Sequence, residues 1–150
     1  GLTDIEAYLE WIHMKDIGDY IEADPALAAM LRRIPCGKSI LTNAIREHAE
    51  RVLDALGIRD QFEHIFDIRD YAYRNKPHPA AYRTGLEGIG YPADEVLFID
   101  DNISFMQPFL DLGGHVLLVD EQQRHSGSPY PSIRHIGELE EHLRKHYRCG

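Results

Sequence analysis

The spacing of apolar residues along the chain predicts alternating strands and helices from residue 36 onward. Residues 96–99 and 116–119 are unbroken apolar runs, which are typical of strands buried on both faces of a parallel sheet. Residues 38–43 and 62–68 predict two further strands. Because strands that alternate with helices usually pair in parallel, this order predicts an α/β fold with a doubly wound parallel sheet.

Local signals mark where the helices between these strands begin and end. Apolar residues recur at helical spacing over residues 44–56, and Gly57 follows at the position where a left-handed residue closes a helix. Pro79 is placed like the first residue of the next helix. For the helix after the third strand, Ser104 is the expected N-cap and Gln107 completes a capping box.

The first 35 residues show helical spacing and no strand pattern. They predict one helix over residues 2–12 and a second that begins at Asp24-Pro25. We therefore divide the chain into residues 1–35, a helical cap remnant or linker, and residues 36–150, an α/β core. The two helices are either a small subdomain or lid, or packing helices of the main body.

Composition narrows the class of protein. The chain has 150 residues, 43% of them apolar and 27% charged, which is typical of one soluble globular domain. Its formal charge of −9 argues against nucleic-acid binding, and no apolar run is long enough to cross a membrane. Cys36 and Cys149 are too few for a disulfide framework, so we expect a reducing, cytoplasmic location and no signal peptide.

Polar residues that could carry chemistry follow three of the predicted strands. Thr42 and Asn43 follow the first, Lys76 comes after the second, and Asp100 and Asp101 end the third. Because the carboxyl ends of parallel strands meet at one edge of a sheet, we expect these residues to converge. Carboxylate oxygens suit Mg²⁺, and a hydroxyl, a helix start and an ammonium suit a phosphoryl group.

Each of these residue types also has an ordinary structural use. Thr42 and Asn43 could serve only as helix caps, and Lys76 could be a solvated turn lysine. Asp100 and Asp101 could belong to a solvated turn before a helix. Their placement at three consecutive junctions favours the functional interpretation.

The same residues carry a resemblance to a known family. Residues 39–44, 75–79 and 97–102 resemble the second, third and fourth motifs of the haloacid dehalogenase (HAD) superfamily, and in particular the pyrimidine 5′-nucleotidase-like phosphatases. The resemblance extends over roughly residues 5–120. It implies a Rossmann-like core with a helical cap, of which this chain holds a part.

The resemblance also implies a role for each candidate residue. Thr42 would bind the transferring phosphoryl group with the help of Asn43, and Lys76 would steady the phosphate and the nucleophile. Asp100 and Asp101 would hold Mg²⁺, which makes Thr42, Lys76 and Asp101 the expected catalytic residues.

The chain departs from the family pattern at two places. Phe105 stands where the family often has asparagine. The first motif, an Asp-x-Asp pair on the central strand, is missing, because Asp4, Asp16 and Asp24 follow no apolar run. We therefore expect the sequence to be the carboxyl-terminal part of a longer protein, with the central strand supplied by an upstream segment or by another chain.

These observations together predict a Mg²⁺-dependent phosphomonoesterase of small phosphorylated metabolites, with nucleoside monophosphates as one candidate class. It would act through an aspartyl-phosphate whose nucleophile lies upstream of residue 1, so the chain alone would be inactive. A catalytically inactive binding or scaffolding module is the alternative. A dehalogenase is less favoured, because Asp100 and Asp101 suit metal-assisted phosphoryl transfer.

Overall fold

The structure of the protein is a computed structural model in which residues 21–148 are described. The helix expected over residues 2–12 lies outside the described residues. No helix in the described part is long and apolar enough to cross a membrane. Cys36 is disulfide-bonded, so the expectation of reduced cysteines is wrong at this position.

The strands pair in parallel and form two sheets. The first sheet holds β1 (Ser39–Leu41) and β2 (His64–Phe66), and the second has the order β3-β4-β5. In the second sheet, β3 (Leu97–Asp100) pairs with β4 (His115–Val119), and β4 pairs with β5 (Ser132–Ile133). This confirms the predicted parallel α/β fold.

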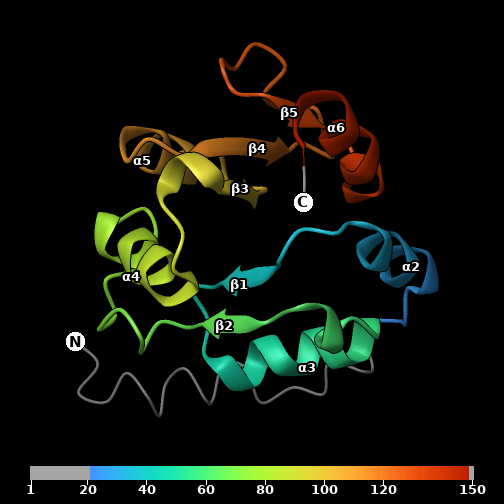
Figure 1. Ribbon diagram of the computed structural model, residues 1–150, viewed down its shortest axis with the longest axis horizontal. Coiled ribbons are helices and arrows are strands. Elements are labelled where there is room, and N and C mark those ends of the chain that lie inside the picture. The colour runs from blue at the N-terminus through green and yellow to red at the C-terminus, as the bar shows by residue number, and fades with distance from the viewer. Residues whose placement is uncertain (1–20, 149–150) are drawn as a thin grey trace.

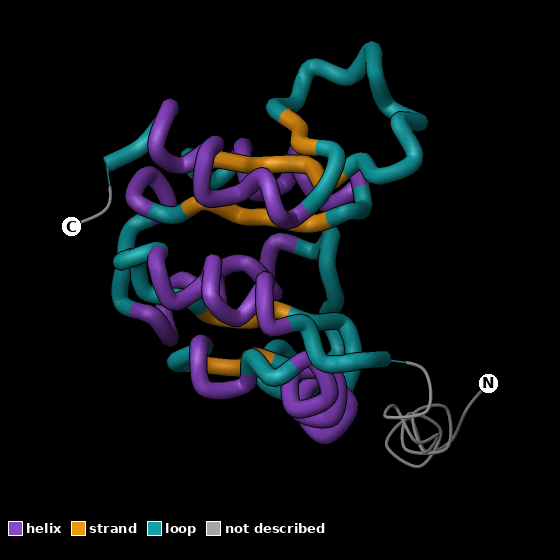
Figure 2. The backbone as a smooth tube through the Cα atoms, turned by 90° about the vertical axis from the view of Figure 1, so that its right-hand side faces the viewer, coloured by secondary structure: helices purple, strands orange, loops and turns teal. Residues whose placement is uncertain are grey.

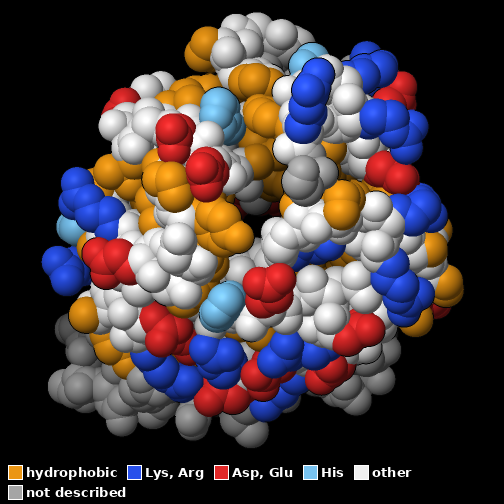
Figure 3. Space-filling view, viewed as in Figure 1, with side chains coloured by type: hydrophobic (Ala, Val, Ile, Leu, Met, Phe, Trp, Pro, Cys, Tyr) orange, Lys and Arg blue, Asp and Glu red, His pale blue; other side chains and the backbone are white. Residues whose placement is uncertain are grey.

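The two sheets lie one above the other with β1 and β3 as their inner strands (Figures 1 and 2). Within residues 21–148, no further strand pairs with the free inner edge of β1 or of β3. The face seen in Figure 3 is hollowed near its middle, between the two halves of the molecule. The central strand that the family resemblance implies is therefore not among the described strands.

Helices connect and cover the sheets. Their bounds are α2 Pro25–Arg33, α3 Arg46–Leu56, α4 Pro79–Ile89, α5 Met106–Asp111 and α6 Leu139–His146. Helix α4 contacts β1, β2 and α5, while α2 contacts α6 (Figure 1). Because α5 packs on β3 and β4, the contacts of α4 join the first sheet to the second.

Strand β4 is buried on both faces, as its apolar run predicts. Leu117 belongs to a core cluster with residues of α2, α3 and α6, whereas Val116 and Leu118 belong to a second cluster around Tyr82 and Phe98. The side chains of residues 116–118 are at most 2% exposed. The alternation of side chains along the strand thus places one apolar core on each side of the second sheet.

Helix α2 begins where the sequence predicts a helix start, at Asp24-Pro25. Asp24 Oδ1 accepts a hydrogen bond from the amide of Leu27 at 3.0 Å, and Pro25 begins the helix. The buried side of α2, which includes Met30 and Leu31, packs into the same cluster as Leu117. This helix therefore packs against the main body, while the division of the chain at residue 35 stays a prediction.

Other element boundaries were predicted with mixed success. Gly57 has φ of 77°, and Pro79 is the first residue of α4, as expected. The expected N-cap at Ser104 is wrong, because the Asn102 side chain accepts from the amide of Ser104 and a 3₁₀ turn over residues 103–105 precedes α5. Gln107 bonds to Asp111 instead of completing a capping box.

Candidate functional site

The centre of the candidate site is an ion pair between the turn that precedes α4 and the last residue of β3. Lys76 Nζ donates to Asp100 Oδ2 at 2.8 Å, and only 7% of Lys76 is exposed. Lys76 follows β2 and Asp100 is the last residue of β3, so the contact brings the carboxyl ends of the two sheets together. The alternative interpretation of Lys76 as a solvated turn lysine is wrong.

Asp101 lies beside this pair and is exposed. A hydrogen bond with Asp100 raises the pKa of the Asp101 carboxyl above its usual value, burial adds to the rise, and the charge of Lys76 opposes it. Asp100 also accepts from the amide of Asn102 at 3.0 Å, which holds the turn closed. A divalent cation bound between the two carboxyl groups would offset the repulsion between their negative charges.

The donor set at this turn fits Mg²⁺ in its chemistry. Asp100 and Asp101 supply carboxylate oxygens, and Mg²⁺ often binds through one or two carboxylates together with waters and substrate phosphate. Within residues 21–148 there is no group of three or more His, Cys, Asp or Glu side chains that could hold a metal ion by themselves. The pair is therefore a partial set of ligands.

Thr42 lies at the end of β1 and is fixed from several sides. Its amide donates to the carbonyl of Phe66 at 3.0 Å, and its own carbonyl accepts from the hydroxyl of Tyr71. Its side-chain oxygen accepts from the amide of Ala44 at 3.0 Å, which is a capping contact. Because that hydroxyl keeps its proton for donation, the same group could also bind a phosphoryl oxygen.

Asn43 holds the backbone of Lys76. Its Nδ2 donates to the Lys76 carbonyl and its Oδ1 accepts from the Lys76 amide, each at 3.0 Å. The side-chain amide thus forms a two-point clamp between the end of β1 and the segment that carries the lysine. The sequence did not predict this contact, and the expected role of Asn43 at the phosphate stays a prediction.

Removing the clamp is expected to loosen Lys76. In Asn43→Ala, both Lys76 backbone groups lose their partners, and we expect a loss of about 1–2 kcal/mol in the free energy of unfolding. Asn75→Ala is the matched control, because the Oδ1 of Asn75 accepts no hydrogen bond within the described residues. Urea unfolding of both variants measures the difference, and equal losses would contradict the clamp.

Asp67 is a buried acid that the sequence analysis missed. It is 3% exposed, and its carboxylate accepts from the amides of Arg46 at 2.8 Å and Arg69 at 3.0 Å. Arg46 is the first residue of α3, so Asp67 joins the start of that helix to the turn after β2. The available signal was a carboxylate near the end of the strand predicted over residues 62–68, which the structure ends at Phe66.

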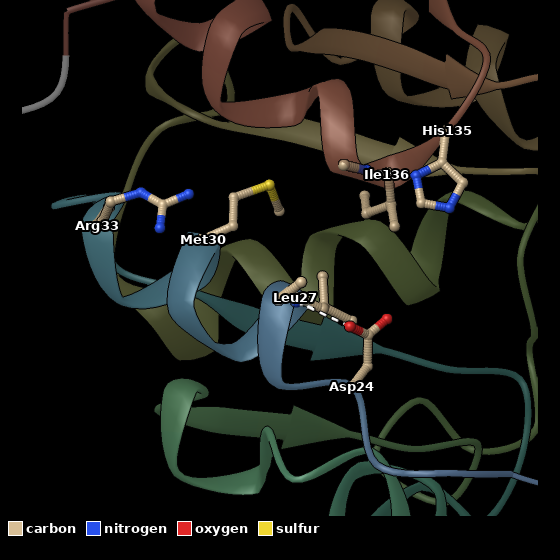
Figure 4. A pocket seen from close by; sticks show the side chains of 8 residues that line it. Asp24, Leu27, Met30, Arg33, His135 and Ile136 are labelled. Atoms are coloured by element: carbon tan, nitrogen blue, oxygen red, sulfur yellow. Dashed lines mark hydrogen bonds between the residues drawn. The ribbon is translucent and has the colours of Figure 1, made fainter.

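A separate pocket of about 230 Å³ lies between α2 and the segment before α6 (Figure 4). Figure 4 shows Asp24, Leu27, Met30 and Arg33 on the α2 side, opposite His135 and Ile136. Its charged and polar groups already have partners: Arg33 bonds to Glu140, Asp24 to the amide of Leu27, and His135 Nδ1 accepts from Gly137. The pocket shares no residue with the Lys76–Asp100 site.

Comparison with known proteins gives a consistent family. A family model described as a haloacid dehalogenase-like hydrolase matches residues 4–107. Haloacetate dehalogenase H-2 from Moraxella sp. (strain B) is 33% identical over 93 residues, which cover 62% of this chain and 39% of that protein. The chain thus spans well under half the length of this curated relative.

Solved structures share the fold at low identity. An L-2-haloacid dehalogenase from Xanthobacter autotrophicus, with chloropropionic acid covalently bound, aligns with a TM-score of 0.71 at 20% identity, covering 97% of this chain and 70% of that chain. A HAD phosphatase from Thermococcus onnurineus gives 0.71 at 20% identity, covering 91% and 64%. These likenesses confirm the fold.

Proposed function

Since the chain belongs to the haloacid dehalogenase-like hydrolase family, we propose that it carries most of the active site of a Mg²⁺-dependent phosphomonoesterase. The observation that supports this most strongly is the adjacent carboxyl pair of Asp100 and Asp101 beside the buried ammonium of Lys76. We propose small phosphorylated metabolites as substrates, with nucleoside monophosphates as one candidate class.

Each residue has a proposed part in binding the phosphoryl group. Lys76 would place a positive charge beside the phosphoryl oxygens, and the Thr42 hydroxyl would donate a hydrogen bond to one of them. Asn43 keeps Lys76 in place through its clamp. Asp100 and Asp101 would hold Mg²⁺, which when bound offsets negative charge on the phosphoryl group.

The proposed reaction also needs a nucleophile that none of these five residues supplies. We propose that it is a carboxylate on a strand that pairs with the inner edges of β1 and β3, carried by an upstream segment or by another chain. Within residues 21–148, the inner edges of β1 and β3 face each other without a strand partner, which supports this proposal because buried backbone groups need hydrogen-bond partners. A cytoplasmic location stays a prediction, and the bonded state of Cys36 argues against it.

The direct test is an assay of the gene product at its natural length. We expect it to release phosphate from simple phosphomonoesters when Mg²⁺ is present and to stop when the metal is chelated. The 150-residue chain alone serves as the control, and we expect it to release no phosphate. If the natural-length protein releases no phosphate and shows no Mg²⁺-dependent thermal shift, the inactive binding module becomes the better interpretation.

Replacing Asp101 with asparagine tests the proposed metal site in the chain itself. Without metal, the wild-type free energy of unfolding should fall as the pH rises through the raised pKa of Asp101, because ionisation places two negative charges side by side. Asp101→Asn removes this dependence and should raise stability at neutral pH by at most about 1 kcal/mol, since the residue is exposed. It should also abolish stabilisation by Mg²⁺.

The control for this variant is Asp54→Asn, which neutralises an exposed acid of α3. Thermal unfolding of the three proteins with and without Mg²⁺ gives the comparison. An unchanged Mg²⁺ shift in Asp101→Asn would exclude this carboxylate as a ligand.

Dehalogenation is a second candidate, favoured by the 33% identity to Haloacetate dehalogenase H-2. The two candidates are separated by supplying haloacetate and a phosphomonoester to the same natural-length preparation. Release of halide without release of phosphate would favour the dehalogenase. We prefer the phosphatase because the Asp100–Asp101 pair suits a metal ion.

A further inference from the structure

The Lys76 side chain is enclosed by aromatic rings as well as by Asp100. Its ammonium lies 5.4 Å from the centroid of the Phe98 ring and 5.0 Å from that of the Phe105 ring. A cation over the face of an aromatic ring within about 6 Å is attracted by the ring, and more strongly where water is excluded. Because only 7% of Lys76 is exposed, little water reaches its ammonium, and we expect a strong attraction to both rings.

Phe105 is itself held firmly. Its carbonyl accepts a hydrogen bond from the hydroxyl of Tyr82 at 2.7 Å, and Tyr82 is 1% exposed. The Tyr82 ring meets the Phe98 ring edge-on, with centroids 5.3 Å apart. Phe105 packs against the same cluster, so its backbone and its ring are both fixed relative to Phe98.

The aromatic ring at position 105 differs in chemistry from the asparagine that the family often has there. An asparagine would offer the ammonium a second oxygen and would also attract water. A phenylalanine ring attracts the charge without accepting a conventional hydrogen bond. Asp100 is the only side chain of the described residues with a hydrogen bond to the ammonium.

We propose that Phe105 is a positioning residue, which closes one side of Lys76 and keeps its ammonium directed at Asp100 and toward the substrate. The effect on catalysis rests on the proposed function, but the effect on Lys76 does not. Losing the ring should lower kcat in the natural-length enzyme by about fivefold, which corresponds to about 1 kcal/mol. The KM should change little, because in this proposal the ring acts on the substrate only through Lys76.

The test observes Lys76 directly. The chain has few lysines, Lys15, Lys38, Lys76 and Lys145, so protein with ¹³C-labelled lysine gives a simple NMR spectrum. The two rings should shift the Lys76 side-chain signals upfield of the other lysines, and the signals are assigned by their loss in Lys76→Met. Phe105→Leu should move them back toward the ordinary position, and Phe105→Tyr, which keeps the ring, should leave them in place.

Phe62→Leu is the control, because Phe62 is a half-buried phenylalanine of the other core cluster. It should cost stability without moving the Lys76 signals. If Phe105→Leu does not fold, Phe105→Met replaces it in the same comparison. Unmoved Lys76 signals in the ring-free variant would overturn the proposal, whereas failure of the phosphatase assay would leave this result intact.

Discussion

Replacing Lys76 with methionine is expected to lower the proposed phosphatase activity of the natural-length protein strongly and to destabilise the chain. The loss of the ammonium should lower kcat by about 10²-fold or more, the cost of removing one charged or donor group at a developing oxyanion. The methionine side chain can still fill the space between Phe98 and Phe105. The loss of stability therefore comes mainly from Asp100.

Asp100 becomes an unpaired charge in this variant. Its side chain is 15% exposed, and Lys76 Nζ is its ion-pair partner at 2.8 Å. Breaking a buried pair by removing one partner costs about 3 kcal/mol or more, whereas replacing both partners by neutral groups costs much less. We expect the double variant Lys76→Met, Asp100→Asn to recover most of the stability and none of the activity.

Urea unfolding of the two single variants and the double variant closes a thermodynamic cycle for the pair. A positive coupling between the two positions is the expected result. If the two losses simply add, the ion pair has no coupling energy, and Lys76 is held by the Asn43 clamp and by packing.

Replacing Asp67 with alanine is expected to cause the other large loss, about 3 kcal/mol or more in the free energy of unfolding. Three backbone amides, of Arg46, Arg69 and Asp70, donate to this carboxylate, which is 3% exposed. Alanine removes this acceptor from the amides of Arg46 and Arg69, whereas the Asp70 amide keeps its bond to the Asp67 carbonyl at 3.0 Å. The start of α3 also loses the negative charge that stabilises a helix N-terminus.

Glu47→Ala is the matched control for Asp67. Glu47 also pairs with Arg69, at 2.9 Å, but its side chain is 52% exposed, so we expect a cost below about 1 kcal/mol. Asp67→Asn should fall between the two, because one oxygen remains as an acceptor. Similar losses for Asp67→Ala and Glu47→Ala would mean that the buried hydrogen bonds contribute little.

The parts of the fold that sequence alone predicted are those with local causes. The burial of β4 on both faces follows from its unbroken apolar run, and the left-handed Gly57 and the first-turn Pro79 follow from their own backbone preferences. Strand β5 was missed because Ser132–Ile133 is too short to show a period. Ser104 was mistaken for the cap because Asn102, two residues away, is an equally good one.

Sequence alone predicted that Lys76 and Asp100 would lie close together, but it did not predict the other contacts around Lys76. The convergence of Lys76 and Asp100 follows from parallel topology. The clamp from Asn43 to the Lys76 backbone joins residues 33 positions apart, and no local pattern encodes it. The position of Phe105 over Lys76 is likewise a property of packing between elements.

The separation of the strands into two sheets also bears on local unfolding of the chain. The β1–β2 pair and the β3–β4–β5 group have independent backbone hydrogen-bond ladders. Cooperativity between them therefore rests on side-chain packing and on the few bonds that cross between the halves, such as that of Lys76 with Asp100. The core cluster that contains both Ile65 of β2 and Leu117 of β4 supplies such packing. A strand that paired with both inner edges would merge the two ladders and make their opening a single event.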